Sequence, residues 1–356
     1  MKSLSIVICT YNRQPELKKV LQELFRQFKE LALTSSDIKK IINDIELVIV
    51  DNNSTDETGS MIFNMISQKE SGNLDMKYII EMEQGSSPAR NRGIKESSGN
   101  VIAFLDDDIL LDKNWLVEVY NLVSNKPQSF IRGCRVIALW SGEIPEWLSI
   151  EPPFEIIESC FPAHDYGEER RNYPFYLDSS QEEEEDINFL GSFGEKLTAF
   201  QDQFKRKVSN PISACFLASR DIFEKHGGFR LDLGIQGKTR GACEDTELFW
   251  RLIAAKEEVI YEPTVKVYHP IAPTRMTKKF VIEWYTLLGK TLMFMQTKGL
   301  NHLSPGHLDT KLRLKTKLWI FRTFYLFSLL LMDPIKSFWF QAQIAKTKGA
   351  LEFLSI

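Results

Sequence analysis

Predominantly apolar runs alternate with amphipathic stretches along the first half of the chain. Residues 4–9 and 45–50 are runs of strand length, which is typical of parallel strands covered on both faces. Between them, apolar residues recur at helical spacing after Pro15, a residue that suits the first turn of a helix. Further strands are expected at residues 76–80 and 101–105. Strands that alternate with helices predict an α/β fold with a mostly parallel, twisted sheet flanked by helices.

A capping signal and a loss of periodicity mark the elements that follow. Ser54 and Glu57 form a capping-box pattern, which predicts that a helix begins at Ser54. Between residues 140 and 210 the pattern dissolves, and the acidic run at 181–186 indicates a solvated loop. Order then returns in a strand at 212–219, a helix at 244–255 and a strand at 259–268.

Polar residues follow three of the expected strands at the point where each strand ends. They are residues 10–13 (TYNR), 51–53 (DNN) and 106–108 (DDD). Ligands of open α/β sheets bind outside the carboxyl ends of the strands. The sequence therefore predicts a ligand site at this edge of the sheet.

Three consecutive aspartates are the strongest sign of chemistry in the chain. Because alternate residues of an extended chain share a face, Asp106 and Asp108 can point together while Asp107 points away. Two convergent carboxylates suit a hard divalent cation such as Mn²⁺ or Mg²⁺. Such an ion could bridge a diphosphate and neutralise its charge as a leaving group. The alternative is a loop turn in which aspartates, Asp112 among them, cap the next helix.

Two neighbouring carboxylates and one histidine are further candidates in the second half. Glu244 and Asp245 stand at the start of an amphipathic helix, where carboxylates stabilise the free backbone N–H groups and the helix dipole. That structural role alone could explain the pair, or one of them could be a general base for an acceptor hydroxyl. His269 precedes Pro270, and a lone histidine is more often structural than a ligand.

Arg90 lies between the third and fourth strands in the sequence Arg-Asn-Arg-Gly. Its guanidinium could clamp a phosphate or merely face solvent. No G-x-G-x-x-G follows the first strand, which argues against a dinucleotide-binding fold. The chain also lacks the G-x-S-x-G sequence that would indicate a serine hydrolase.

Charge and cysteine usage narrow the class of protein and its location. A net charge of −4 over 356 residues does not suit nucleic-acid binding, which usually needs a strong basic excess. The five cysteines include no C-x-x-C pair, so neither a disulfide framework nor a thiolate zinc site is expected. The N-terminus reads as a buried strand and not as a signal peptide. A reducing cytoplasm is the expected location.

The C-terminal segment differs in character from the rest of the chain. Residues 318–332 are mostly apolar and aromatic, but they are too few to span a bilayer. From Lys298 onward, nine basic residues face only three acidic ones. This composition suits a helix in the interface of an anionic membrane, with peripheral contact through residues 311–340 on the inner face of the cytoplasmic membrane. A terminal helix that packs on the preceding part of the chain or on a second subunit is the alternative.

Six segments of the sequence together resemble the family 2 glycosyltransferases with the GT-A fold. They are SIVICTYNR at 5–13, LVIVDNNSTDET at 47–58, ARNRGI at 89–94, VIAFLDDD at 101–108, GACEDTELFWRL at 241–252, and Tyr268 with His269. They occur in the family's order and cover about residues 3–270. The resemblance implies a catalytic domain at 1–275, with an acceptor-side insertion at about 140–210, and a helical C-terminal extension at 276–356.

The resemblance also implies a reaction and its partners. The activity would be the inverting transfer of a single sugar from a nucleotide diphosphate sugar, with UDP-sugars favoured, to a hydroxyl group. The acceptor would be a glycan or a lipid-linked molecule in glycan, polysaccharide or glycolipid assembly. A Q-x-x-R-W sequence, common at the acceptor site of processive polysaccharide synthases, is absent, so a non-processive enzyme is expected.

Site roles follow from the same resemblance. The implied nucleotide-sugar ligands are Thr10, Tyr11, Arg13, Asp51, Arg90, Asp106 and Asp107. Among them Asp51 would face the base, Arg90 would reach the nucleotide or its phosphates, and Asp107 would contact the ribose. The metal ligands would be Asp106, Asp108 and His269, holding Mn²⁺ or Mg²⁺. Asp245 would be the general base, with Glu244 as second candidate.

One departure from the family and two rival functions remain. Asn52 stands where many relatives carry a second aspartate, which could alter nucleotide preference. A nucleotidyltransferase would also use paired aspartates on an α/β fold, but it would usually show a Gly-rich, basic loop after the first strand. A non-catalytic nucleotide-sugar-binding or scaffold protein would be expected to lose part of the acidic set.

Overall fold

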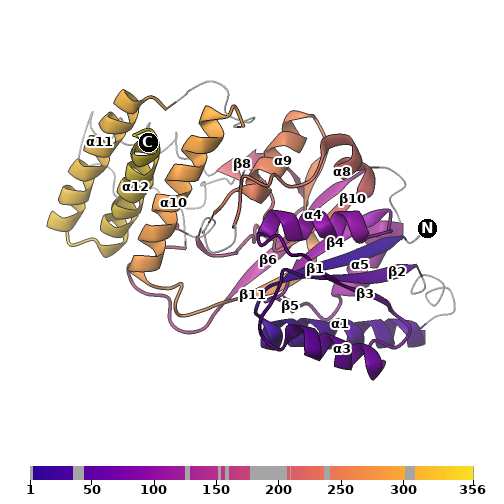
Figure 1. Ribbon diagram of the computed structural model, residues 1–356. Helices are drawn as coiled ribbons and strands as arrows, with labels where there is room; N and C mark the ends of the chain where they lie inside the picture. The colour runs from indigo at the N-terminus through magenta and orange to yellow at the C-terminus, as the bar shows by residue number, and fades with distance from the viewer. Residues whose placement is uncertain are drawn as a thin grey trace.

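The computed structural model describes residues 3–34, 44–124, 129–150, 154–156, 160–176, 207–208, 210–235, 241–300 and 309–355. In this part of the chain, one large sheet is covered by helices on both faces, and three C-terminal helices stand beside it (Figure 1). The acidic run expected to be a solvated loop, at residues 181–186, lies outside the described residues.

The first half of the chain forms a parallel sheet with strand order β3-β2-β1-β4. The strands are β1 (Leu4–Thr10), β2 (Ile45–Asp51), β3 (Asp75–Ile80) and β4 (Val101–Asp106). Its helices are α1 (Gln14–Thr34), α3 (Thr58–Ser67), α4 (Ser86–Glu96) and α5 (Trp115–Ser124). The four expected strands are therefore confirmed to within one residue at each end.

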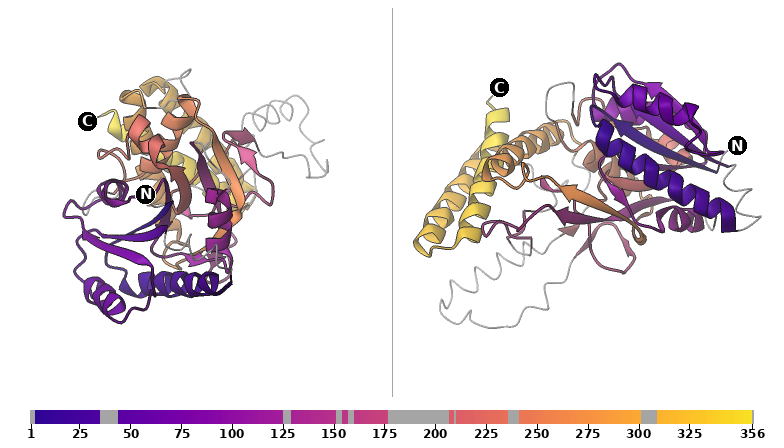
Figure 2. Two further views of the ribbon diagram at one scale, coloured as in Figure 1. Left: turned by 90° about the vertical axis from the view of Figure 1, so that its right-hand side faces the viewer. Right: turned by 90° about the horizontal axis from the view of Figure 1, so that it is seen from below.

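Both faces of this sheet are buried, as the apolar strands require. Ile6 and Ile8 of β1 pack in a core with residues of α1, α3 and α5, whereas Val7 packs on the other face with α4, α8 (Arg220–His226) and α9 (Glu244–Ala254). Figures 1 and 2 show these two layers of helices. α4 was not predicted, because it carries few apolar residues. It lies so close to β1 that a Cβ on Gly93 would approach Val7 Cγ1 to 2.4 Å.

Beyond β4 the sheet becomes mixed, so the expectation of mostly parallel pairing holds for its first half. β10 (Cys215–Ser219) runs antiparallel to β4 and to β6 (Ile131–Trp140), and β6 is parallel to β11 (Val259–Ile271). Two-residue strands complete the pairing: β5 (Leu110–Leu111) and β7 (Arg171–Asn172) beside β11, and β8 (Phe175–Tyr176) with β9 (Lys207–Val208) in a separate pair.

Two expected element starts are corrected by the structure. The helix expected at Ser54 begins at Thr58, because the Ser54 hydroxyl accepts a hydrogen bond from the Asn12 amide (2.9 Å) instead of capping a helix. The strand expected at residue 212 begins at Cys215. The amide of Ser213 donates to Asp245 Oδ2 and the carbonyl of Ala214 accepts from the Asp106 amide, so these groups are not available to a strand ladder.

Three long helices follow the sheet: α10 (Lys278–Thr297), α11 (Lys311–Leu330) and α12 (Pro334–Phe353). α10 and α12 cross at two glycines. A Cβ on Gly289 would lie 1.9 Å from the Lys346 carbonyl oxygen, and one on Gly349 would lie 2.0 Å from that of Thr286. Residues of these helices share a core with Trp147, Leu148, Ile156, Cys160 and Phe161, as in the edge-on contact of Trp147 and Phe338 (4.3 Å between ring centroids). No described helix combines the length and the apolar character that a bilayer span needs.

Candidate active site

A cavity of about 300 Å³ opens at the carboxyl ends of β1, β2 and β4. This edge of the sheet is on the side of the C-terminal helices (Figures 1 and 2). The predicted site residues that line it are Thr10, Tyr11, Arg13, Asp106, Asp107, Asp108 and His269. The residues not predicted that also line it are Cys9, Asn52, Gln84, Gly85, Ser86, Ala89, Pro162, Ile235 and Arg275. Asp51, Arg90, Glu244 and Asp245 are not part of this lining.

Asp106, Asp108 and His269 converge in the cavity. One ligand atom from each lies within 4.8 Å of the other two. His269 is buried and comes from β11, opposite the end of β4, so two distant parts of the chain meet here. Two carboxylates and an imidazole form a donor set suited to a divalent cation such as Mn²⁺.

Two observations show that these side chains fit a cation. His269 Nδ1 lies 3.0 Å from the Pro270 carbonyl oxygen, which can only accept, so Nδ1 carries the proton and Nε2 faces Asp108 at 3.3 Å. The Asp108 atom that Nε2 faces, Oδ1, is buried and accepts no hydrogen bond from the described residues. Burial works to lower the pKa of His269, but the Asp108 carboxylate outweighs it and raises the pKa above its usual value. A cation between Asp108 and His269 would take the place of the second proton, which a charged His269 carries on Nε2.

Asp107 points away from this group and toward Arg13. Arg13 Nη1 lies 2.7 Å from Asp107 Oδ1 and 2.8 Å from Asp108 Oδ2, and so ties the two neighbouring carboxylates together. Burial raises the pKa of Asp107 to about 6, although Arg13 opposes the shift. The Arg13 side chain remains 42% exposed at the cavity, so it can still meet an anionic ligand.

Asp51 is engaged on both carboxylate oxygens. The Tyr78 hydroxyl donates to Oδ2 (2.5 Å), and the Ser54 amide donates to Oδ1 (2.8 Å). Its neighbour Asn52 lines the cavity and also binds the chain that leads into α4, since its Oδ1 accepts from the Gly85 amide at 2.7 Å. The contact of Asp51 with a base therefore stays a prediction, and Asn52 is the residue of this loop nearest the cavity.

Glu244 and Asp245 lie beside the cavity in the first turn of α9. The Arg90 Nη1 donates to Glu244 Oε1 at 2.9 Å. Asp245 accepts from the Ser213 amide at 3.1 Å and from the Thr246 amide at 2.7 Å. Burial raises the pKa of Asp245, Glu244 adds to the effect, and Arg90 opposes it. A carboxylate with a raised pKa near a ligand site is suited to accept a proton.

The family described as Glycosyl transferase family 2 matches residues 5–227. The chain belongs to this family. As a family 2 glycosyltransferase it is a transferase, and its fold is the GT-A fold expected from the sequence.

Individual relatives of this family 2 glycosyltransferase cover different shares of the chain. The glucosyl-dolichyl phosphate glucuronosyltransferase of Haloferax volcanii is 22% identical over 271 residues, 75% of this chain and 69% of that one. The GalNAc(5)-diNAcBac-PP-undecaprenol β-1,3-glucosyltransferase of Campylobacter jejuni is 33% identical over 110 residues, 30% of each chain. The mannosyltransferase PcManGT from Pyrobaculum calidifontis, solved with GDP-Man and Mn²⁺, has a TM-score of 0.57 at 15% identity. That match covers 99% of this chain and 86% of the other, and it supports the fold alone.

The family 2 glycosyltransferase has site residues that no sequence pattern revealed. Arg275 lines the cavity but stands in the irregular segment between β11 and α10. Burial works to raise the pKa of Asp108, but His269, Arg13 and Arg275 together lower it. Ser213 connects Arg90 to Asp245 through its hydroxyl and its amide. Neither residue belongs to a motif, and only the tertiary fold brings them to the site.

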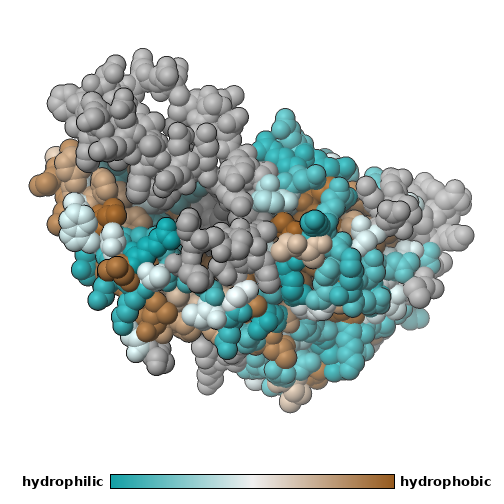
Figure 3. Space-filling model, turned by 90° about the horizontal axis from the view of Figure 1, so that it is seen from above, coloured by the Kyte–Doolittle hydropathy of each residue, from teal (hydrophilic) through white to brown (hydrophobic). Residues whose placement is uncertain are grey.

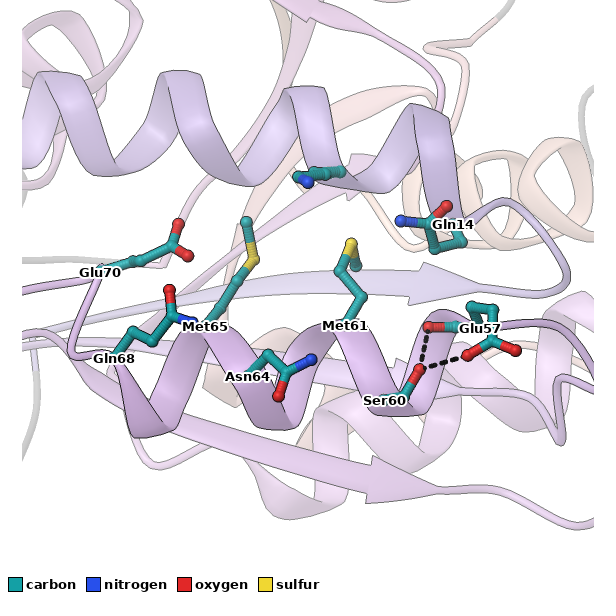
Figure 4. A pocket seen from close by; sticks show the side chains of 9 residues that line it. Gln14, Glu57, Ser60, Met61, Asn64, Met65, Gln68 and Glu70 are labelled. Carbon is teal, nitrogen blue, oxygen red and sulfur yellow. Dashed lines mark hydrogen bonds between the residues drawn. The ribbon is translucent and has the colours of Figure 1, made fainter.

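A second cavity, of about 340 Å³, lies between α1 and α3 (Figure 4). Met61 and Met65 point from α3 toward α1, and the remaining side chains are polar. Ser60 donates to the Glu57 carboxylate at 2.7 Å. None of the residues in the acidic and histidine group lines this cavity, so the site at the end of β4 is the candidate for chemistry.

Proposed function

We propose that this family 2 glycosyltransferase moves a single sugar from a nucleotide diphosphate sugar to an acceptor hydroxyl, with inversion at the anomeric carbon. The observation that carries the proposal is the convergence of Asp106, Asp108 and His269 in a cavity beside Asp245. A divalent cation, Mn²⁺ or Mg²⁺, would be held by those three residues. When bound, it would neutralise charge on the leaving diphosphate.

The donor would bind along the carboxyl edge of the sheet. Arg13 and Arg275 line the same cavity as the acidic group and would pair with phosphate oxygens. Tyr11 is 44% exposed at the cavity and offers an aromatic face to the base. Asp51 and Asp107 would complete the nucleoside pocket. UDP-sugars are the favoured donors.

The transfer itself would be a single displacement. The acceptor oxygen forms a bond to the anomeric carbon as the bond from that carbon to the diphosphate breaks, and the bonding pair leaves with the nucleoside diphosphate. The hydroxyl proton passes to a carboxylate of α9. Asp245 is the first candidate, because Glu244 already pairs with Arg90. Two backbone amides orient Asp245 while leaving lone pairs on its oxygens.

The acceptor would be a glycan or a lipid-linked molecule reached at a membrane surface. Residues 311–340 would make the contact with the inner face of the cytoplasmic membrane. The end of α11 and the loop that follows it expose Leu330, Leu331 and Met332, with exposed fractions of 80%, 60% and 88%. Figure 3 shows apolar side chains at the left margin, where this helical hairpin lies. Exposed apolar patches of this kind are typical of interaction surfaces.

A thermal-shift screen with UDP-, GDP-, dTDP- and CMP-sugars, each with and without Mn²⁺, tests the proposal. A ligand that binds only the folded state raises the melting temperature. We expect one nucleotide class to raise it and the rise to need Mn²⁺. Asp108→Asn should remove the Mn²⁺-dependent part, while Asp112→Asn, outside the acidic group, should not. A melting temperature that no nucleotide sugar changes would refute the proposal.

A further inference from the structure

Arg90 is a buried cation that joins three elements of the candidate site. Its side chain projects from α4 and is only 11% exposed. Nη1 donates to Glu244 Oε1 of α9 at 2.9 Å, and Nη2 donates to Ser213 Oγ at 3.0 Å. Nη2 also lies 3.6 Å from Asp106 Oδ1, at the end of β4. A single guanidinium therefore spans both carboxylate groups of the site.

The segment in front of β10 is the second link between those groups. The Ser213 amide donates to Asp245 Oδ2 at 3.1 Å, and the carbonyl of the next residue, Ala214, accepts from the Asp106 amide at 3.0 Å. Asp245 and Asp106 are thus hydrogen-bonded to two adjacent residues, Ser213 and Ala214, of one backbone segment. Because Arg90 also donates a hydrogen bond to the Ser213 hydroxyl, movement of the guanidinium would move this backbone segment.

The neighbouring residues hold Arg90 in place. Its guanidinium carbon lies 5.4 Å from the centre of the Phe229 ring, a cation–π contact. Asn91 fixes the backbone of Phe229 with two hydrogen bonds of 2.8 Å, one to its carbonyl oxygen and one from its amide. Arg92, two residues along the same helix, instead pairs with Glu96 of that helix, and both side chains are part-exposed. The two arginines of this motif therefore have different surroundings.

We propose that Arg90 is a positioning residue. It fixes the position of the proton-accepting carboxylate of Asp245 relative to the donor-side carboxylate of Asp106. The inference rests on the proposed function, since it requires a base and a donor site. It assigns Arg90 a role other than direct contact with the nucleotide or its phosphates. In this geometry both Nη atoms are engaged by protein groups, and the side chain does not line the cavity.

The contacts require an arginine and not merely a positive charge. The guanidinium is planar and directs several N–H groups along fixed directions, whereas an ammonium is a single point charge. Arg90→Lys would keep the charge but could not reach Glu244, Ser213 and Asp106 together. Small shifts of a catalytic group cost large factors in rate because the reacting atoms must be aligned.

The test compares Arg90→Lys with the matched control Arg92→Lys on the same helix. The nucleotide sugar that binds the wild-type protein is the probe, and its Mn²⁺-dependent binding and its hydrolysis, with water as acceptor, are both measured. We expect Arg90→Lys to lower kcat for hydrolysis about 10- to 100-fold while the Kd changes less than about threefold. Arg92→Lys should leave both unchanged. A Kd that rises as much as kcat falls would overturn the inference in favour of direct donor contact.

A double-mutant cycle with Asp245→Asn separates positioning from general loss of structure. If Arg90 acts through Asp245, the double variant should be no slower than Asp245→Asn alone. Fully additive losses would overturn the inference. If Arg90→Lys does not fold, Ser213→Ala takes its place in both measurements, since it removes only the hydroxyl link. Wild-type protein that binds and hydrolyses no nucleotide sugar would instead refute the proposed function.

Discussion

Burial is the main influence on the pKa values of the carboxylates at this site. Asp245 stands in the first turn of α9, where free N–H groups and the helix dipole stabilise a negative charge. Burial and the adjacent Glu244 act in the opposite direction and raise its pKa above the usual value of 3.8, while Arg90 opposes them. The outcome is a carboxylate that takes up a proton more readily than one in water, as a general base should.

The pH dependence of the rate should report this raised pKa. A base is active only when deprotonated, so the rate should rise with pH through the pKa of Asp245. On the acidic side, activity should therefore be lost at a higher pH than an ordinary aspartate would give. Asp245→Asn should lower kcat about 10²- to 10⁴-fold and abolish this acidic limb. Donor binding should persist, which a nucleotide-binding assay checks. Full residual activity of this variant would exclude Asp245 as the base.

Seven of the residues that line the cavity were predicted from the sequence, but their hydrogen-bond and ion-pair partners were not. Asp106 and Asp108 could be paired from strand alternation, and His269 could be added from the family resemblance, because these signals are local or recurrent. Arg90 could not be assigned in the same way. Whether its guanidinium faces a ligand or Glu244 depends on α9, which lies more than 150 residues later in the chain. Arg275 was missed because the irregular segment around it carries no periodic pattern.

At the scale of elements, a buried charge cluster joins the ends of the first strands away from the site. Glu46 of β2 is fully buried, accepts a hydrogen bond from the Ser5 hydroxyl at 2.6 Å, and pairs with Lys77 of β3 at 2.8 Å. The amide of Ser98, between α4 and β4, also donates to it. Burial alone would raise the pKa of Glu46, but these contacts outweigh it and lower the pKa from 4.5 to about 2.

This cluster predicts a pH-dependent loss of stability for Glu46→Gln. A depressed folded-state pKa stabilises the fold above the unfolded-state pKa, and the contribution disappears as the pH falls through the folded-state pKa. The variant should lose about 2–3 kcal/mol of unfolding free energy at pH 7. The difference should shrink between pH 4.5 and pH 2. Denaturant unfolding at several pH values measures both effects.

Glu30→Gln is the matched control for that experiment. Glu30 pairs with Arg26 on the exposed face of α1, and its side chain is 60% exposed. Surface pairs of this kind contribute about 0–1 kcal/mol, so this variant should change little at any pH. A Glu46→Gln protein with a constant deficit from pH 7 to pH 2 would show that the effect comes from packing and not from charge.

Element boundaries were predictable where burial alone decides them. The strands at residues 4, 45 and 101 start where expected, because strands covered on both faces are marked by apolar runs. The starts of α3 and β10 were not predictable, because polar groups there bind distant partners. Ser54 bonds to Asn12 across 42 residues, and Ser213 bonds to Asp245 across 32. Local patterns contain no information about such partners.

At the scale of the whole molecule, α11 and α12 form a C-terminal hairpin whose tip is apolar and whose remaining charged residues are mostly basic. The tip comprises the exposed residues Leu326, Phe327, Leu329, Leu330, Leu331, Met332 and Ile335. Asp333 is the one acidic residue of the hairpin between 311 and 351, and its charge is used as the cap of α12 and in a 3.1 Å pair with Lys336. The division into a catalytic domain at 1–275 and an extension at 276–356 stays a prediction, since both contribute to one core around Trp147 and Phe338.

The charge of this surface favours an anionic bilayer over a second copy of the chain. In a symmetric dimer the same surface meets itself, so the basic residues of two hairpins would face one another and repel. Anionic lipid headgroups would instead attract them, by about 1 kcal/mol for each lysine or arginine near the surface. The hairpin also shares a core with Cys160 and Phe161, and Phe161 directly precedes Pro162 in the cavity lining. Contact at the tip would therefore keep the cavity near lipid-linked acceptors.

Vesicle sedimentation should test this contact with a tip variant, Leu330→Glu combined with Met332→Glu. The wild-type protein should bind phosphatidylcholine vesicles that contain phosphatidylglycerol better than vesicles without it, and added salt should weaken the binding by screening. Each buried leucine or methionine contributes about 1.5–3 kcal/mol, so the variant should bind at least about tenfold more weakly. Leu33→Glu, at an 85% exposed site on α1, is the control and should bind normally. Because no residue of the tip lines the cavity, donor hydrolysis should be equal in all three proteins. Undiminished vesicle binding by the tip variant would exclude the tip as the contact, and a wild-type dimer that the variant converts to a monomer would assign the surface to a second copy.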